Sequence, residues 1–132
     1  MKMMIVDDSL TMVRILSTAA QKTIKDVDVI LCYNGQEALD KLKENEDVKL
    51  ILLDVNMPVL DGKEFLKILR SNETYNHIKV IMQTTEAGNS EIKKMIALGI
   101  SGYLMKPYQT TKVMELMKQL APVVGYELLD NN

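Results

Sequence analysis

Five short apolar segments alternate along this chain with five longer amphipathic segments, and this alternation limits the possible folds more than any other feature. The apolar segments are residues 3–6, 27–32, 50–53, 78–82 and 102–105. Each is nearly continuous in Val, Ile, Leu and Met, which is typical of strands buried on both faces of a parallel sheet. The order therefore predicts a strand followed by a helix, five times over.

The amphipathic segments carry their apolar residues at the spacing of an α-helix. They are predicted at 9–22, after the capping residue Asn34, after Gly62, at 86–98 and at 110–120. Gly99 supplies a C-terminal stop for the fourth helix. The residues expected to face the sheet are Met12, Val13, Ile15, Leu16, Ala19, Ala20, Ala38, Leu39, Leu42, Phe65, Leu66, Ile68, Leu69, Ile92, Met95, Ile96, Val113, Leu116, Met117 and Leu120.

This pattern predicts an α/β fold with a doubly wound, five-stranded parallel sheet and helices on both of its faces. The common flavodoxin-like strand order, 2-1-3-4-5, fits it. A chain of 132 residues suits one domain with one core, which we expect at residues 1–124. Residues 125–132 fall outside the pattern and are expected to be a flexible tail.

Composition and charge exclude several classes of protein. Apolar residues are 47% of the chain and charged residues 26%, the balance of a globular protein rather than a disordered one. The net charge of -2 argues against nucleic acid as a partner, and no apolar segment is long enough to cross a bilayer. The N-terminus turns acidic too early for a signal peptide, so a cytoplasmic protein is expected. The single cysteine, Cys32, is expected to be a buried structural thiol.

Polar side chains follow four of the five predicted strands. Asp7 and Asp8 follow the first, Asp54 the third, Thr84 the fourth and Lys106 the fifth. A doubly wound sheet binds its ligand at the carboxyl ends of its strands, near the point where the strand order reverses. Strands one and three are neighbours at that point, so three carboxylates should meet there, with a hydroxyl and an ammonium beside them.

Three crowded carboxylates repel one another, and one or more of them should have a raised pKa. A divalent cation removes that repulsion, and an oxygen-rich site of this kind suits Mg²⁺, which often shares a phosphate group. The ammonium of Lys106 and the hydroxyl of Thr84 add groups that stabilise charge on a phosphoryl group in transfer. The sequence therefore predicts a magnesium site for phosphoryl chemistry.

The motifs at these strand ends resemble those of the receiver domains of bacterial response regulators. They are Val-Asp-Asp-Ser at 6–9, Leu-Asp-Val-Asn-Met-Pro at 53–58, Asp-Gly at 61–62, Thr84, and Lys-Pro at 106–107, with Tyr103 three residues before the lysine. The resemblance extends over nearly the whole chain, from about residue 2 to 120. It is strongest to the stand-alone, CheY-like chemotaxis type, because Asn-Met-Pro, Thr-x-Glu-Ala and Gly-Tyr-x-x-Lys-Pro all recur.

The resemblance implies a role for each residue of the acidic site. Asp54 would be the phosphoacceptor, whose carboxylate attacks the phosphoryl group of a histidine kinase. Asp8 would bind Mg²⁺ directly and Asp7 partly through water, while Asn56 would contribute its backbone carbonyl to the metal. Lys106 would pair with the phosphoryl oxygens.

The resemblance also implies a conformational switch. Thr84 would hydrogen-bond the phosphoryl group and move toward it, and Tyr103 would turn inward into the space that Thr84 leaves. Such a change is a population shift, because the phosphoryl group makes these contacts in one conformation only. Pro107 would follow a cis peptide bond. The readout surface would be the last two helices and the strand between them.

Two positions that vary within this family are expected to tune the lifetime of the phosphoryl group. Here they are Asn56 and Glu86, whose polar side chains resemble those of regulators with a short-lived signal and an auxiliary phosphatase. Thr85 departs from the small residue usual at its position, and it is expected to narrow the opening to water and to small phosphodonors.

The predicted function is therefore a monomeric, single-domain response regulator, with intrinsic autophosphatase activity but not otherwise an enzyme. Its partners would be a histidine kinase and a flagellar switch protein or other output protein. A phosphorelay shuttle is an alternative, as is a receiver that no longer signals. A phosphatase of the haloacid-dehalogenase type is a further alternative, but its Asp-x-Asp pattern is missing at 7–11.

Each residue also has a simpler interpretation. Asp7 and Asp8 could complement a helix dipole, Thr84 could cap a helix and Tyr103 could be a packed aromatic residue. His77 lies in a polar stretch and is interpreted as a loop residue. The four lysines of the last two helices are equally consistent with a solvated face and with a partner surface; they are Lys93, Lys94, Lys112 and Lys118.

Overall fold

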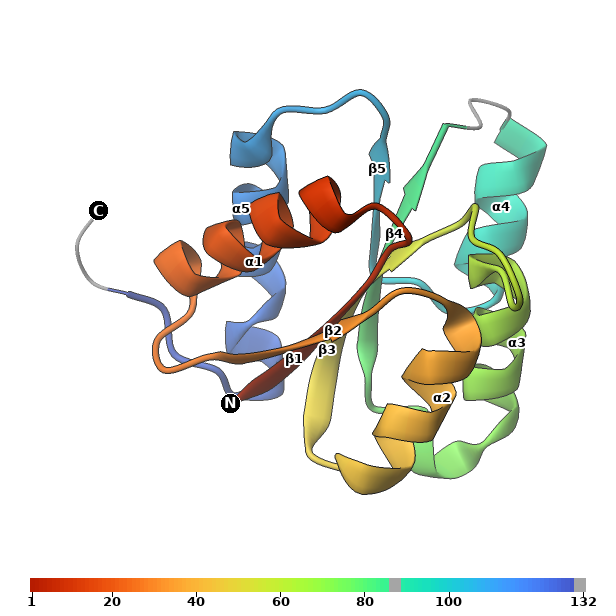
Figure 1. The fold of residues 1–132 in the computed structure, drawn as a ribbon, viewed down its shortest axis with the longest axis horizontal. Coiled ribbons are helices and arrows are strands. Elements are labelled where there is room, and N and C mark those ends of the chain that lie inside the picture. The colour runs from red at the N-terminus through yellow and green to blue at the C-terminus, as the bar shows by residue number, and fades with distance from the viewer. Residues whose placement is uncertain (86–88, 130–132) are drawn as a thin grey trace.

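The computed structural model describes residues 1–85 and 89–129, which form a five-stranded parallel sheet with helices on both faces (Figure 1). The elements are β1 (Lys2–Val6), α1 (Leu10–Thr23), β2 (Asp28–Cys32), α2 (Gly35–Glu44), β3 (Val48–Asp54), α3 (Gly62–Ser71), η1 (Glu73–Tyr75), β4 (Lys79–Thr84), α4 (Asn89–Ala97), β5 (Gly102–Met105), α5 (Thr110–Leu120) and η2 (Pro122–Val124). The strand order is β2-β1-β3-β4-β5, which confirms the predicted doubly wound topology. None of the helices in this part of the chain has the length and apolar character that a bilayer crossing needs.

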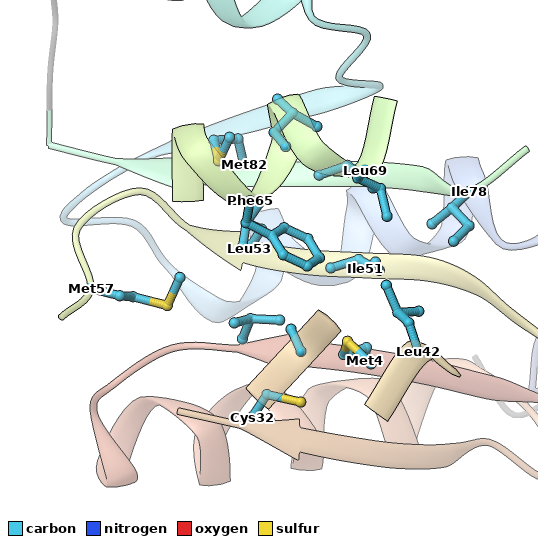
Figure 2. Packing of buried hydrophobic residues seen from close by; sticks show 14 of the residues in the cluster. Met4, Cys32, Leu42, Ile51, Leu53, Met57, Phe65, Leu69, Ile78 and Met82 are labelled. Atoms are coloured by element: carbon cyan, nitrogen blue, oxygen red, sulfur yellow. The ribbon is translucent and has the colours of Figure 1, made fainter. Parts of the chain in front are cut away.

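Two apolar clusters, one on each face, hold the helices to the sheet. Helices α1 and α5 cover one face, while α2, α3 and α4 cover the other (Figure 1). Alternate residues of each strand pack into the two clusters. Met3 and Ile5 face α1 and α5, whereas Met4 and Val6 face α2, α3 and α4. In Figure 2, Phe65 of α3 points toward the β3 side chains of that layer. This alternation decides which polar residues share a face where the strands end.

Three residues expected to face the sheet lie in solvent instead. Ile15, Ile68 and Ile96 are 42%, 43% and 56% exposed. Each directly adjoins a buried residue of the same helix, and successive residues are rotated by about 100° around the axis. The apolar stripe is therefore narrower than the sequence suggests. Cys32 is buried, as predicted, and burial raises the pKa of its thiol to about 11.

Two predicted helix signals appear at their expected positions. The Asn34 Oδ1 accepts a 2.9 Å hydrogen bond from the Glu37 N–H at the start of α2. Gly99 follows α4 with φ of 88°, a conformation that glycine adopts without strain. The start expected for this helix, at 86–88, lies outside the described residues.

The segment beyond α5, which the sequence predicts to be a flexible tail, lies against the domain as far as residue 129. Tyr126 is 6% exposed, and its hydroxyl donates to the Lys2 carbonyl and accepts from the Lys49 N–H. Backbone bonds from Lys25 N–H to Glu127 and from Leu129 N–H to Thr23 continue the attachment. The Tyr126 side chain attaches this segment to the sheet, and the apolar periodicity of the sequence gives no sign of that contact. Residues 130–132 lie outside the described part.

Candidate functional site

The acidic residues that follow β1 and β3 meet at the carboxyl edge of the sheet. Carboxylate oxygens of Asp7, Asp8 and Asp54 lie within 4.8 Å of one another. Asp7 and Asp54 are 1% and 2% exposed, whereas Asp8 is open to solvent. Asp54 is the last residue of β3, and β1 and β3 are adjacent, so the strand order itself brings these groups together. The predicted convergence of three carboxylates is present.

Lys106 lies beside this cluster, just beyond the end of β5. Its Nζ is 2.9 Å from Asp54 Oδ1, and its side chain is 27% exposed. Its backbone N–H donates a 2.8 Å hydrogen bond to the Thr84 carbonyl, which ties the segment after β5 to the end of β4. The ion pair places one fixed positive charge against the most buried end of the cluster. The peptide bond between Lys106 and Pro107 is cis, as the resemblance implies.

The carboxyl group of Asp7 has a pKa above its ordinary value. Burial chiefly raises its pKa, and the charges of Asp54 and Asp8 raise it further. A 2.9 Å hydrogen bond from the Ser9 N–H to Asp7 Oδ1 and the charge of Lys106 act in the opposite direction. Asp7 Oδ2 is buried without a partner among the described residues. An unpaired carboxylate oxygen beside two other carboxylates is what a divalent cation would satisfy.

The simpler interpretation of the aspartate pair does not account for this geometry. The α1 cap is Ser9, whose Oγ accepts a 3.2 Å bond from the Met12 N–H. The first turn of α1 contains no acidic residue. Asp7 therefore supports the turn into α1 through one oxygen while its other oxygen remains available.

The loop after Asp54 is held close to the strand. The Val55 N–H donates to Gln83 at 3.0 Å and the Gly62 N–H donates to Val55 at 2.9 Å. A Cβ at position 62 would lie 2.2 Å from the Asp54 carbonyl oxygen, so glycine is required there. Asn56, at the start of this loop, is exposed. The two hydrogen bonds of Val55 therefore hold the backbone immediately before Asn56.

Thr84 and Thr85 differ sharply in exposure although they are adjacent. Thr84 is fully buried at the end of β4, and Thr85 is exposed. Thr85 lines a cavity of about 370 Å³ together with Met12, Lys106, Pro107 and Tyr108. The cavity is therefore lined in part by Lys106, which forms the ion pair with Asp54. Glu86 lies outside the described residues.

Tyr103 lies away from the acidic cluster. Its side chain is 41% exposed, and it lines a second cavity, of about 440 Å³, over β5 and α5. Lys112 is another lining residue of that cavity. His77 is exposed in a turn before β4, as expected of a loop residue.

Sequence reasoning missed two residues near the cluster, Gln83 and Tyr108. Gln83 is fully buried one position before Thr84, and its Oε1 accepts a hydrogen bond from the Tyr108 hydroxyl. The available signal was a lone amide within an otherwise apolar strand, which needs a polar partner when buried. The partner could not be identified because it is 25 positions away in the chain.

Comparisons with known proteins agree with this geometry. Residues 3–118 match the family described as the response regulator receiver domain. A chemotaxis protein CheY homolog of Campylobacter jejuni is 39% identical over 125 residues, which cover 95% of this chain and 93% of that protein. The solved CheY4 of Vibrio cholerae has 30% identity and a TM-score of 0.80, covering 90% and 97% of the two chains. The Mn²⁺-bound form of the response regulator Rcp1 has 25% identity and a TM-score of 0.74, covering 90% of each.

Proposed function

The chain belongs to the response regulator receiver domain family, and from this we propose that it is a phosphorylation switch that accepts a phosphoryl group on Asp54. The observation that carries the proposal is the buried Asp54 carboxylate, held 2.9 Å from Lys106 and adjacent to two further carboxylates. A buried nucleophile with one fixed cation and a place for a second is suited to phosphoryl transfer, which depends mainly on positioning and charge.

In the transfer step, an Asp54 carboxylate oxygen forms a bond to phosphorus while the P–N bond of a kinase phosphohistidine breaks. The electron pair of that bond stays on the imidazole, which leaves neutral when its other nitrogen carries a proton. Lys106 already lies against Asp54, and its ammonium can pair with the phosphoryl oxygens as they arrive. The burial of Asp54 limits access by water, which protects the acyl phosphate.

We further propose that Asp7, Asp8 and Asp54, with the backbone carbonyl of Asn56, hold Mg²⁺. The unpaired Asp7 Oδ2 and the close approach of the three carboxylates support this assignment. The Mn²⁺-bound Rcp1 structure supports it from a family member. When bound, the ion would neutralise the repulsion between these groups and the incoming phosphoryl oxygens.

The output is proposed to follow from Thr84 and Tyr103. Thr84 is buried at the end of β4, next to the cluster, whereas the Tyr103 ring is partly exposed on the neighbouring strand. A phosphoryl group that draws Thr84 toward it would favour an inward Tyr103 and so change the α4-β5-α5 face. The exposed Lys93 and Lys94 of α4 and Lys112 and Lys118 of α5 would suit an acidic partner that contacts both helices.

The similarity to CheY proteins supports chemotaxis as the process. A histidine kinase would supply the phosphoryl group, and a flagellar switch protein would be the output partner in the cytoplasm. A shuttle role in a phosphorelay is the alternative output. Asn56, Thr85 and Glu86 are proposed to set the rate of autodephosphorylation, with an auxiliary phosphatase acting at the same place.

The central test is phosphorylation by acetyl phosphate in the presence of Mg²⁺. The parent should gain one phosphoryl group, detected by intact-protein mass spectrometry, and Asp54→Asn should gain none. Asp40→Asn is the matched control, because Asp40 is an exposed carboxylate of α2 that pairs with Gln36. Equal incorporation into the parent and Asp54→Asn would remove Asp54 from the role of acceptor.

A further inference from the structure

A hydrogen-bonded polar pair, the buried Gln83 and the half-buried Tyr108, lies beside the acidic cluster. Gln83 is aligned with Asp54 in the β3–β4 ladder and is fully buried. Strand alternation places it on the α1 and α5 face, with Asp7 and Asp54, because Ile81 two residues earlier packs there. The Tyr108 hydroxyl donates to Gln83 Oε1, while Gln83 Nε2 has no partner among the described residues. A buried unpaired donor is costly, so it invites a functional explanation.

Tyr108 is placed between the acidic cluster and the groove over β5 and α5. It lines the cavity that contains Thr85 and Lys106, and it also lines the cavity that contains Tyr103 and Lys112. Burial raises the pKa of the Tyr108 hydroxyl, and the charges of Asp7 and Asp54 raise it further. The hydroxyl therefore stays protonated and serves as a hydrogen-bond donor to Gln83.

A route from Asp54 to the groove follows from the chain itself. Lys106 pairs with Asp54, and Tyr108 lies two residues further along. Pro107 between them has a fixed φ, which removes one of the backbone torsions that could absorb a displacement of the Lys106 backbone before it reaches Tyr108. Gln83 resists that displacement, because its amide is anchored on the strand that ends in Thr84.

Building on the proposed function, we propose that Gln83 and Tyr108 are positioning residues that couple occupancy of the phosphoryl site to the shape of the β5–α5 groove. When Lys106 shifts from Asp54 to a phosphoryl group, the segment that carries Tyr108 shifts with it. The hydrogen bond to Gln83 then sets where the tyrosine ring can go, and the ring forms part of the groove wall. The pair acts in addition to Thr84 and Tyr103 and by a separate path.

The test uses beryllofluoride with Mg²⁺, a phosphoryl mimic that binds without covalent chemistry, and backbone amide NMR of the full chain. The reporters are the amides of Lys112 and Leu116, which line the groove. Tyr108→Phe removes the hydroxyl alone, Gln83→Leu removes the amide, and the double variant removes both. Tyr33→Phe is the control, on a partly exposed tyrosine beyond β2.

At saturating beryllofluoride, the parent and Tyr33→Phe should show the same change in the reporter resonances, and all three pair variants should lose most of it. The double variant separates coupling from stability, because replacing both partners of a buried bond by apolar groups is nearly neutral. Its melting temperature should approach the parent's while its coupling stays lost. If the double variant shows the same change in the reporter resonances as the parent, the coupling inference is wrong but the proposed function still stands. A parent that fails to bind beryllofluoride would overturn the proposed function and this inference with it.

Discussion

The two edges of the sheet are built in opposite ways. At the amino edge, polar groups are well paired: the Tyr126 hydroxyl joins β1 to β3, and Arg70 donates to the carbonyls of Tyr75, Ile78 and Gly99. At the carboxyl edge, the described residues include two buried side-chain atoms without partners, Asp7 Oδ2 and Gln83 Nε2.

Two of the described non-glycine residues have positive φ, Asp26 before β2 at the amino edge and Val59 at the carboxyl edge, and only Val59 is β-branched. Val59, in the loop after Asp54, has φ of 69° and is 80% exposed. A β-branched residue in this left-handed region is strained, and such strain tends to occur at functional sites. Paired polar groups are therefore concentrated where the strands begin, and unsatisfied groups where they end. The contrast fits the proposed function, in which the unpaired Asp7 Oδ2 would bind a cation.

The largest effect on stability is expected from removing the three hydrogen bonds that Arg70 donates at the amino edge. Arg70→Met should lower the free energy of unfolding by about 2–4 kcal/mol, because three carbonyls lose a charged donor. Lys67→Met, on the exposed side of the same helix, is the matched control and should change stability little. Urea unfolding measures both. If the two variants lose equal stability, the amino edge is not the stabilising one.

A smaller loss is expected from Tyr126→Phe, which removes one hydroxyl and two hydrogen bonds. The Lys49 N–H and the Lys2 carbonyl lose a partner, at a cost of about 1–2 kcal/mol in thermal or urea unfolding. Acetyl phosphate labelling of Asp54 should be unaffected, because the change lies at the opposite edge. A parent-like melting temperature would show that the two hydrogen bonds of the Tyr126 hydroxyl do not stabilise the fold.

The carboxyl edge should respond in the opposite direction. Burial raises the pKa of Asp7 from its ordinary value of 3.8, so between the unfolded and folded values the folded state binds more protons. In chelator, the parent should therefore lose stability as the pH rises from about 4. Asp7→Asn lacks this loss and should exceed the parent near pH 7 by about 1 kcal/mol.

With Mg²⁺ bound, the parent is expected to be more stable than Asp7→Asn. Added Mg²⁺ should stabilise the parent much more than Asp7→Asn, because the variant has lost a ligand. Asp40→Asn, an exposed carboxylate change, should follow the parent at every pH and with or without Mg²⁺. Parallel stability curves for parent and Asp7→Asn would mean that the acidic edge carries no electrostatic strain.

The smallest effect is expected on the lifetime of the phosphoryl group, through the access of water to Asp54. Thr85→Ala should shorten the phosphoryl half-life about threefold, which corresponds to about 0.7 kcal/mol of barrier. The smaller side chain opens the cavity beside Lys106 to water. Phosphorylation by acetyl phosphate should accelerate in parallel, while transfer from a kinase changes little. Thr74→Ala, on η1, is the control, and an unchanged or longer half-life in Thr85→Ala would contradict gating.

The acidic cluster was predictable from sequence because each member lies at, or just beyond, the carboxyl end of a strand. Parallel strands bring their carboxyl ends to one edge, so strand order alone brings Asp7, Asp8, Asp54 and Lys106 together. Local signals such as the Asn34 cap are also readable, since donor and acceptor are close in the chain.

Other features depend on three-dimensional contacts that periodicity does not encode. The Tyr126 anchor joins residues more than a hundred positions apart, beyond the last amphipathic segment. The pairing of Gln83 with Tyr108 requires knowledge of which face of the sheet Gln83 occupies and of the path that the chain takes after β5. The exposure of Ile15 depends on how far the α1 stripe extends around the helix, which the neighbouring α5 determines.

The most direct test of the contrast between the edges is to locate the acyl phosphate. The parent is treated with acetyl phosphate and Mg²⁺, reduced with borohydride to convert an aspartyl phosphate to homoserine, and analysed by peptide mass spectrometry. The account predicts homoserine at Asp54 and none when Mg²⁺ is replaced by chelator. Homoserine at Asp7, as a haloacid-dehalogenase type phosphatase would give, or labelling that needs no Mg²⁺, would contradict it.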